Sequence, residues 1–254
     1  MSAQVPVAVL GARGRMGSAA VTALKEAENT RVVATLGRGD PLEAILESGA
    51  RVAVELTVPS STADNVTWLV EHGISVVVGT TGWDEERLDR LRGVLANHPE
   101  VAVLIAPNFS ISAILAMQFS RLAAPFFTSA EVVETHHPRK LDAPSGTAIH
   151  TAEGIAAARR EAGLEAMPDA TENDPQGARG AVIEGVHVHA IRQQGMNAHE
   201  EIHFGSHGES LTIRTDTYSV QAFMPGIIRA VQEIPHRSGL TIGLENYLGL
   251  SFSA

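Results

Sequence analysis

The sequence of 254 residues contains no cysteine, and this absence excludes disulfide bonds and metal sites built from thiolates. No apolar run approaches the ~20 residues that a helix needs to cross a bilayer. No basic segment with a long apolar core precedes the first apolar run, so we expect no secretory signal and a cytoplasmic protein. Positive charge is not in excess either, because the net charge is −10 at pH 7. This balance disfavours nucleic acid and membrane surfaces as partners but allows a local cationic pocket.

Lysine is scarce, since the chain has only Lys25 and Lys140 beside seventeen arginines. Lysine can exchange protons in catalysis because its pKa can be brought into working range, whereas a guanidinium stays protonated. Lys140 belongs to ETHHPRKLDAPSGTA, residues 134–148, where two histidines, an arginine, a lysine and an aspartate crowd between apolar runs. A Ser145-Gly146-Thr147 turn then opens a predicted helix, whose first backbone N–H groups can bind an anion. The alternative interpretation is a solvated charged loop.

Short apolar runs alternate with helical patterns over the first 110 residues, which is typical of a parallel sheet covered on both faces. The predicted strands are residues 5–10, 31–36, 52–58, 74–78 and 101–106. A serine at position 60 or 61 is expected to cap the helix that follows the third strand.

The pattern changes after residue 110. We predict helices at 111–124 and 145–162, a strand at 130–135, a loop at 163–180, and a final helix and strand at 223–233 and 240–244. Residues 186–191, 198–204 and 209–217 alternate with period two and predict an antiparallel meander. The expected fold class is α/β. Residues 1–110, with 220–254 returning, form a Rossmann-type doubly wound parallel sheet that binds a dinucleotide, and residues 111–219 an α+β domain with a mixed or antiparallel sheet.

A glycine-rich turn, GARGRMG at residues 11–17, lies between the first predicted strand and helix. Gly11 allows the tight turn, Gly14 lets a pyrophosphate approach the backbone, and Gly17 lets the helix pack closely. Arg13 and Arg15 are expected to face the phosphates. The alternative is a tight turn that binds no ligand.

The end of the second predicted strand bears on the choice of cofactor. Strands that select NAD usually end in an acid that accepts from the ribose 2′-hydroxyl, and positions 35–38 contain none. Arg38 would instead attract the 2′-phosphate of NADPH. The hypothesis is a preference for NADPH, with Asp40 as the only nearby acid that could serve NADH.

The motifs VAVLGARGRMG, VVVGTTGW, IAPNFSI and ETHHPRKLDAPSGTA occur in this order. Through them the chain resembles the 4-hydroxy-tetrahydrodipicolinate reductase family, also called dihydrodipicolinate reductases, over essentially its whole length. The resemblance implies NAD(P)H-dependent reduction of 4-hydroxy-tetrahydrodipicolinate to tetrahydrodipicolinate in diaminopimelate and lysine biosynthesis. It also implies a homotetramer assembled through the sheet of the second domain. Gly37 departs from the family, whose members commonly have an acid there, and this weakens the expectation that both cofactors serve.

The resemblance also implies roles for single residues. His136 matches the catalytic histidine, Lys140 the proton donor, and His137, Gly146 and Thr147 match substrate contacts. The residues matching the cofactor site are Gly11, Ala12, Arg13, Gly14, Arg15 and Met16 for the pyrophosphate, and Gly79, Thr80, Thr81, Ala106, Pro107, Asn108 and Phe109 for the nicotinamide half. The residues themselves agree, because a small dicarboxylate needs cations and N–H donors at both ends. His137, Arg139 and Lys140 could supply one end and the turn from Ser145 to Thr147 the other. We assign no metal site.

Two alternatives remain open. HEEIH at residues 199–203 matches a zinc-protease motif, which requires a helix, whereas its flanks alternate as in a strand. Histidines four apart on a strand would be ~13 Å apart, too far to share a zinc ion at ~2.0 Å per ligand. The second alternative is a nucleotide-sensing module without catalysis.

Overall fold

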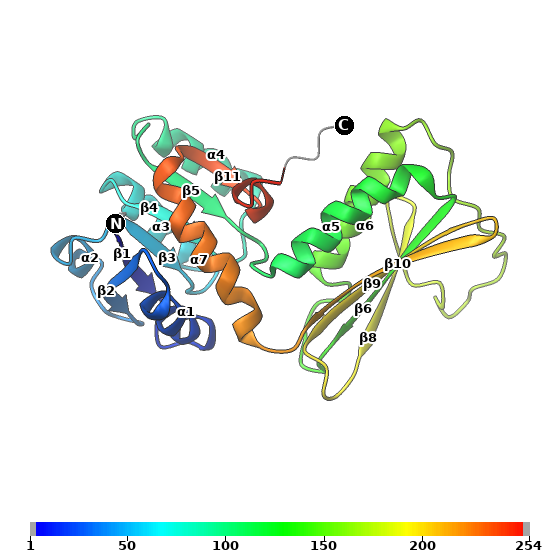
Figure 1. Ribbon diagram of the computed structural model, residues 1–254, viewed down its shortest axis with the longest axis horizontal. Coiled ribbons are helices and arrows are strands. Elements are labelled where there is room, and N and C mark those ends of the chain that lie inside the picture. The colour runs from blue at the N-terminus through cyan, green and yellow to red at the C-terminus, as the bar shows by residue number, and fades with distance from the viewer. Residues whose placement is uncertain (1–3, 251–254) are drawn as a thin grey trace. The chain divides into compact units, whose positions relative to one another are not determined.

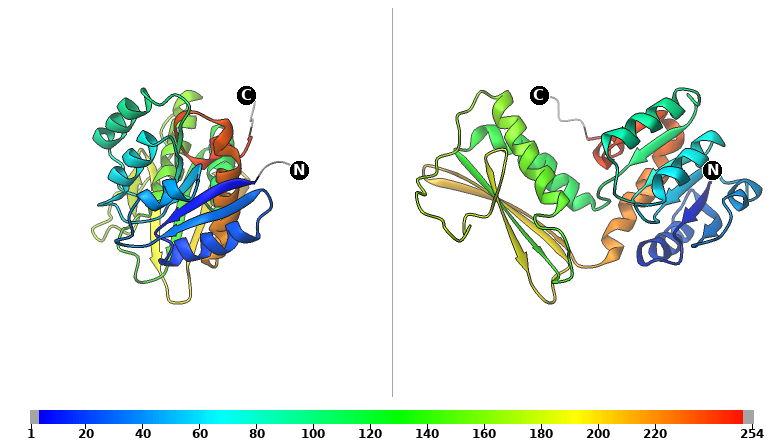
Figure 2. Two further views of the ribbon diagram at one scale, coloured as in Figure 1. Left: turned by 90° about the vertical axis from the view of Figure 1, so that its left-hand side faces the viewer. Right: turned by 180° about the vertical axis from the view of Figure 1, so that it is seen from behind.

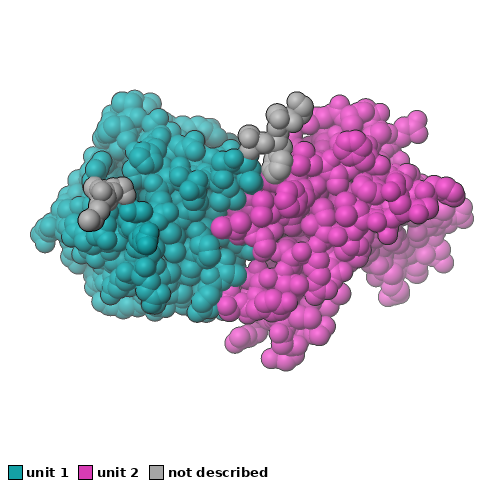
Figure 3. Space-filling view, viewed as in Figure 1, with its two compact units in different colours: residues 1–110, 220–254 teal, residues 111–219 magenta. Residues whose placement is uncertain are grey.

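The computed structural model describes residues 4–250, which form two units (Figure 1). Unit 1 combines the chain up to Ser110 with the chain from Val220 onward, and unit 2 is Ile111–Ser219. Figure 3 shows the two units in different colours. No helix within residues 4–250 is long and apolar enough to cross a membrane.

Unit 1 is built on a six-stranded sheet in which all strand pairs are parallel, in the order β11-β5-β4-β3-β1-β2. Its strands are β1 (Val5–Leu10), β2 (Thr30–Leu36), β3 (Val52–Glu55), β4 (Ser75–Val78), β5 (Ala102–Ile105) and β11 (Gly239–Ile242). The central strands are runs of Val, Ala, Leu and Ile buried on both faces, because helices cover both sides. The order reverses between β1 and β3, which is where such sheets bind ligands at the carboxyl ends of their strands.

The helices of unit 1 divide between the two faces of the sheet. Figures 1 and 2 show α1 (Arg15–Glu26) and α7 (Met224–Glu233) on one face, and α3 (Thr62–Glu71) and α4 (Glu85–Leu95) on the other. The remaining helical segments are α2 (Glu43–Glu47), η2 (Val220–Phe223), η3 (Ile234–His236) and η4 (Leu244–Tyr247).

Unit 2 is a five-stranded mixed sheet in the order β10-β9-β6-β8-β7. Its strands are β6 (Ser129–His136), β7 (Ala181–Ile183), β8 (Val186–Arg192), β9 (Ala198–Ser206) and β10 (Glu209–Thr217). The helices α5 (Ile111–Ala123) and α6 (Gly146–Glu161) lie side by side on one face, and η1 (Ala124–Phe126) follows α5 (Figures 1 and 2). Val132, Ile155, Ile202 and Phe204 form the core between sheet and helices.

The predicted meander is wrong, although β9 and β10 do form the expected hairpin. β6 lies between β8 and β9, parallel to β8 and antiparallel to β9. The link from β8 to β9 passes the end of β6, where the N–H of Gln193 donates to the carbonyl of His136 at 2.9 Å. Alternation assigns residues to faces of a sheet but does not select strand neighbours. The short strand β7, paired with β8, was not predicted.

The predicted serine cap of α3 is also wrong. Ser61 is the N-cap residue, but its hydroxyl makes no capping bond and lies 3.2 Å from the hydroxyl of Thr57. Its φ of −121° and ψ of −14° are not the extended conformation that aims an N-cap side chain at the helix. Ser145, with φ −68° and ψ 151°, has that conformation, and its hydroxyl accepts from the N–H of Ala148.

Candidate active site

The glycine turn between β1 and α1 borders a cavity of about 620 Å³ in unit 1. Of the predicted cofactor residues, Gly11, Arg13, Gly14 and Arg38 line it, whereas Ala12, Arg15 and Met16 lie outside its lining. Gly11 has φ +75°, and a Cβ there would lie 2.1 Å from the carbonyl oxygen of Leu56. A side chain at this position would therefore be strained and would collide with the backbone, so the tight turn requires glycine.

Gly17 shows how closely α1 packs against the turn. A Cβ on residue 17 would lie 2.1 Å from the carbonyl oxygen of Gly11. The first turn of α1 can therefore pack against the glycine turn only because residue 17 has no side chain. The turn leaves room for a pyrophosphate beside the backbone, and the residues present fit a nicotinamide dinucleotide.

Arg13, which lines this cavity, contacts the segment that follows β2. Its guanidinium pairs with the carboxylate of Asp40 at 3.0 Å, and its side chain passes over Gly37. Asp40 also accepts from the N–H of Gly37 at 2.8 Å. Asp40 and Arg38 line the same cavity.

The residues predicted to line the nicotinamide half follow two neighbouring strands. Gly79, Thr80 and Thr81 come directly after β4, and residues 106–109 (Ala106, Pro107, Asn108 and Phe109) directly after β5. A Cβ on Gly79 would lie 2.6 Å from the ring of Phe109, so the two segments are in close contact. The hydroxyl of Thr80 is buried and has no hydrogen-bond partner among the residues described. None of these residues lines the cavity beside the glycine turn.

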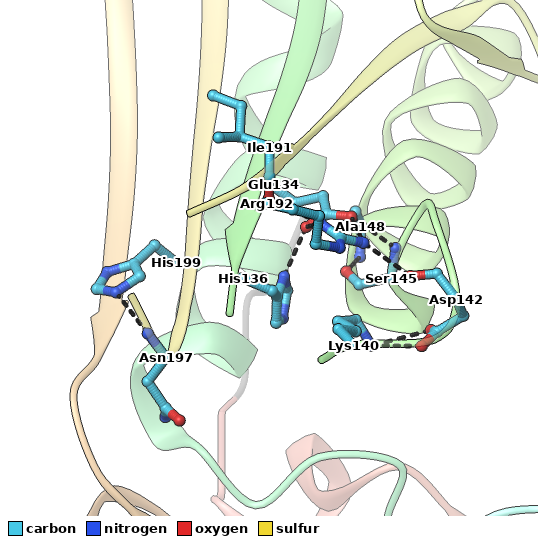
Figure 4. A network of polar contacts seen from close by, with 10 residues as sticks. All are labelled: Glu134, His136, Lys140, Asp142, Ser145, Ala148, Ile191, Arg192, Asn197 and His199. Atoms are coloured by element: carbon cyan, nitrogen blue, oxygen red, sulfur yellow. Dashed lines mark hydrogen bonds and ion pairs between the residues drawn. The ribbon is translucent and has the colours of Figure 1, made fainter. Parts of the chain in front are cut away.

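A buried carboxylate that was not predicted, Glu134, organises the His136 region of unit 2. It is 0 % exposed, and the side chains of His136 and Arg192 and the start of α6 converge on it (Figure 4). Its oxygens lie 2.5 Å from Nδ1 of His136 and 2.8 and 2.9 Å from the two terminal nitrogens of Arg192. Burial acts to raise the pKa of Glu134, but hydrogen bonds from His136 and Arg192 outweigh it and hold that pKa below its usual range.

Alternation in the sequence does contain a signal for this cluster. Glu134 is in phase with the buried Ala130 and Val132 of β6, and Arg192 is in phase with the buried Val186 and Val188 of β8. A charged residue in phase with a buried face needs a partner of opposite charge.

Lys140 lies in the loop after β6, and its ammonium contacts the carboxylate of Asp142 at 2.8 and 2.9 Å. The hydrogen bond from Lys140 lowers the pKa of Asp142. Arg192 also donates to the carbonyl of Asp142 at 2.7 Å, so one cation holds both this loop and Glu134. His136, Lys140 and Ser145 therefore lie around one end of β6 (Figure 4).

The other predicted substrate contacts belong to the same segment. Nδ1 of His137 is buried and has no hydrogen-bond partner within the described residues. Ser145 caps α6, Gly146 is its exposed first residue, and Thr147 follows. A Cβ on Gly146 would meet no atom within 4 Å, so the fold itself does not demand glycine there. Of the backbone N–H groups at the start of α6, that of Ala148 donates to the hydroxyl of Ser145 at 3.2 Å, and the anion site expected at this turn stays a prediction.

A second buried acid lies beside this cluster. Glu200 of β9 is directly opposite Glu134 of β6, and one of its oxygens lies 2.6 Å from the hydroxyl of Thr151 in α6. Burial raises the pKa of Glu200 to about 7; the Thr151 contact opposes this shift, and the charge of Glu134 adds to it. The Thr151 hydroxyl also lies 3.0 Å from the carbonyl of Thr147. The Thr151 hydroxyl is the donor in its contact with Glu200, which is why this contact opposes the rise of the Glu200 pKa.

The HEEIH segment lies within strand β9, which confirms that its alternation indicates a strand. His199 pairs with Asp216 at 2.6 Å, and Nε2 of His203 lies 3.4 Å from Glu201. The arrangement lacks the helix that a zinc-protease motif requires.

Comparison with known proteins identifies the family. The family model described as "Dihydrodipicolinate reductase, N-terminus" matches residues 5–109, and the one described as "Dihydrodipicolinate reductase, C-terminus" matches residues 112–248. The chain belongs to the dihydrodipicolinate reductase family. This confirms the predicted family.

Similar family members cover nearly the whole chain. The 4-hydroxy-tetrahydrodipicolinate reductase of Corynebacterium aurimucosum is 58% identical over 97% of this chain and 99% of its own length. The Streptomyces avermitilis enzyme of the same name is 55% identical, with 96% and 98% covered.

Solved structures confirm the α/β fold class. The dipicolinate-bound dihydrodipicolinate reductase from Paenisporosarcina sp. TG-14 has a TM-score of 0.85 and 32% identity, over 96% of this chain and 99% of that chain. An amine dehydrogenase from Mycobacterium smegmatis, with a TM-score of 0.62 and 10% identity over 94% and 95% of the two chains, shares the fold alone.

Proposed function

We propose that this chain reduces 4-hydroxy-tetrahydrodipicolinate to tetrahydrodipicolinate with a nicotinamide cofactor, as a step of diaminopimelate and lysine biosynthesis. The observation that carries the assignment is the match of both halves of the chain to one reductase family. The chain is an NAD(P)H-dependent oxidoreductase of that family. Unit 1 is proposed to bind the dinucleotide, and unit 2 to bind the substrate.

The proposed substrate is a small ring with two carboxylates, which requires positive charge and N–H donors. Lys140, His136 and His137 supply the positive or hydrogen-bonding side chains in unit 2, and the start of α6 supplies backbone N–H groups. The related Paenisporosarcina enzyme binds dipicolinate, a flat dicarboxylate ring, which supports this substrate class.

The reaction exchanges the 4-hydroxyl group for hydrogen, so it consumes one hydride and one proton and releases water. A bound nicotinamide supplies the hydride. Loss of water breaks the C–O bond at C4 and leaves a double bond conjugated with the ring C=N. As the hydride adds to this double bond, electrons move toward the ring nitrogen, and a proton taken up at the neighbouring carbon restores the C=N bond of the product. His136 and Lys140, which come from the same end of β6, are proposed to deliver it, with His136 as the catalytic histidine and Lys140 as the proton donor.

The assignment is tested by supplying freshly made product of the preceding synthase and following the absorbance of NADPH. We expect oxidation of NADPH that depends on this substrate. Binding of NADPH without oxidation would favour a nucleotide-sensing module instead.

NADPH is proposed as the preferred cofactor because Arg38 lines the cavity of unit 1. We expect Arg38→Ala to raise KM for NADPH by about tenfold or more, the loss of one charge-assisted contact, with little effect on NADH. Asp40→Asn is expected to raise KM for NADH instead, because Asp40 is the acid nearest the end of β2. Steady-state kinetics with both cofactors provide the test, and a clear NADH preference of the unchanged enzyme would contradict the proposal.

Gly146 is proposed to lie against a substrate carboxylate. We expect Gly146→Ala to fold normally, because a Cβ there meets no atom within 4 Å, yet to raise the substrate KM roughly tenfold by its methyl group. The matched control is Gly154→Ala, because Gly154 also lies in α6 and a Cβ there meets no atom within 4 Å. That control should gain stability with an unchanged KM. A normal KM in both variants would place the carboxylate elsewhere.

A homotetramer assembled through the sheet of unit 2 is also proposed. α5 and α6 lie on one face of this sheet, and the other face exposes Val182 and Ile191. Light scattering during size-exclusion chromatography should give about four times the chain mass of 26.9 kDa. A monomer mass would contradict this assembly.

A further inference from the structure

We propose that Glu134 is a positioning residue that holds His136 in the tautomer with the proton on Nδ1. His136 then presents Nε2 as the only ring nitrogen that can exchange a proton with the substrate. The inference rests on the proposed function, since it deepens the role of His136 in that reaction. It names a residue that touches neither substrate nor cofactor and acts through its neighbour.

The first support is the set of four donors that meet the two oxygens of Glu134. One oxygen lies 2.5 Å from Nδ1 of His136 and 2.8 Å from a guanidinium nitrogen of Arg192. The other lies 2.9 Å from the second guanidinium nitrogen and 3.1 Å from the N–H of Ser145. A guanidinium and a backbone N–H can only donate, so Glu134 accepts from them as a carboxylate.

An ionised carboxylate can only accept, which decides the state of His136. Because Nδ1 lies 2.5 Å from an acceptor-only oxygen, Nδ1 carries a hydrogen. The lowered pKa of Glu134 agrees with the ionised form. In the neutral imidazole Nε2 is then an acceptor, and in the imidazolium it is a donor, so one atom can take up and return the proton.

The same carboxylate also aligns His136 with the anion-binding turn. Glu134 accepts from the N–H of Ser145, the N-cap residue of α6, and its partner Arg192 donates to the carbonyl of Asp142. Both contacts hold the loop that connects β6 to α6. Glu134 is 0 % exposed and Arg192 provides its counter-charge, so this geometry is fixed before any substrate arrives.

An amide at this position would disturb the tautomer. In Glu134→Gln an NH₂ group, which can only donate, replaces one carboxylate oxygen. At either oxygen position it would meet two groups that donate to Glu134 in the unchanged protein. Placed toward Ser145, it would oppose Arg192 and a backbone N–H, neither of which can accept. With the NH₂ group toward His136, the contact with Arg192 would be the one that remains between two donors. The imidazole can carry its hydrogen on Nε2 instead and accept from the NH₂ group at Nδ1. The glutamine variant therefore favours the opposite tautomer.

The experiment combines nitrogen-15 NMR of the resting protein with steady-state kinetics. At a pH where the imidazole is neutral, the unchanged protein should show His136 protonated at Nδ1, assigned by loss of its signals in His136→Gln. In Glu134→Gln we expect a shift to the Nε2–H form and a kcat lowered by roughly 100-fold, within the range of general acid–base catalysis. KM for NADPH should not change.

Glu134→Asp covers the case in which the glutamine variant does not fold. Aspartate keeps the negative charge that pairs with Arg192, but its shorter side chain moves the carboxylate oxygen away from Nδ1 of His136. This variant should therefore lose the preference for the Nδ1–H tautomer and have a lower kcat. The matched control is Glu131→Gln, because Glu131 lies on β6 and contacts His189 at 2.7 Å and Arg179 at 2.5 Å. This control should leave both readouts unchanged.

An Nε2–H tautomer in the unchanged protein, or normal kcat in a folded Glu134 variant, would overturn the inference. The NMR readout needs no substrate, so it stays separate from a failure of the proposed reaction.

Discussion

Replacing His136 or Lys140 with alanine is expected to lower kcat by roughly 10²–10⁴-fold, the usual contribution of a general acid or base. Both side chains lie at the end of β6, and both are held by carboxylates, Glu134 for His136 and Asp142 for Lys140. Either substitution removes a group that is proposed to deliver the proton after hydride addition.

The measurement is NADPH oxidation with the synthase product, together with NADPH affinity from fluorescence titration. The affinity should stay normal, because the proposed cofactor residues belong to unit 1 and these two residues to unit 2. The control is His150→Ala, since His150 is an exposed histidine of α6 paired with Glu153. Near-normal turnover in both variants would remove the proposed roles of His136 and Lys140.

Replacing Glu200 with glutamine is expected to make the protein more stable than the unchanged chain at pH 8, but not at pH 4. The pKa of the buried carboxyl is about 7 in the folded state against an ordinary value of 4.5. A raised carboxyl pKa means that the folded state binds the proton more tightly than the unfolded state. This contribution to stability is fully present below about pH 4.5 and is lost as the pH rises through about 7.

The size of this effect follows from the shift. At about 1.4 kcal/mol per pKa unit, the stability lost as the pH rises through both pKa values is about 3 kcal/mol. Glutamine avoids this loss because it stays neutral, and its side-chain oxygen can still accept from the hydroxyl of Thr151. Urea unfolding of both proteins from pH 4 to 8 gives the difference. Glu209→Gln, an exposed position at the start of β10, should show no such trend. A constant difference across this range would show that folding does not raise the pKa of Glu200.

Much of the fold could be predicted because its elements have local signals. The continuous apolar runs of β1 and β5 predict strands buried on both faces, and the glycine turn predicts the start of α1. The turn at Ser145-Gly146-Thr147 was also correctly placed at the start of a helix, α6. The neighbours of β6 could not be predicted, because alternation fixes a face and long-range packing chooses the partner.

The sequence by itself determined the order of the elements, the family, and the segment that contains His136 and Lys140, because these depend on residues close together in the chain. The tertiary structure alone decided that Arg192, 58 positions from Glu134, neutralises that carboxylate. It also decided that Glu200 comes to lie opposite Glu134, and that Arg13 pairs with Asp40, 27 positions away. The physical reason is that a buried charge requires partners, and only the folded chain brings distant side chains within hydrogen-bonding distance.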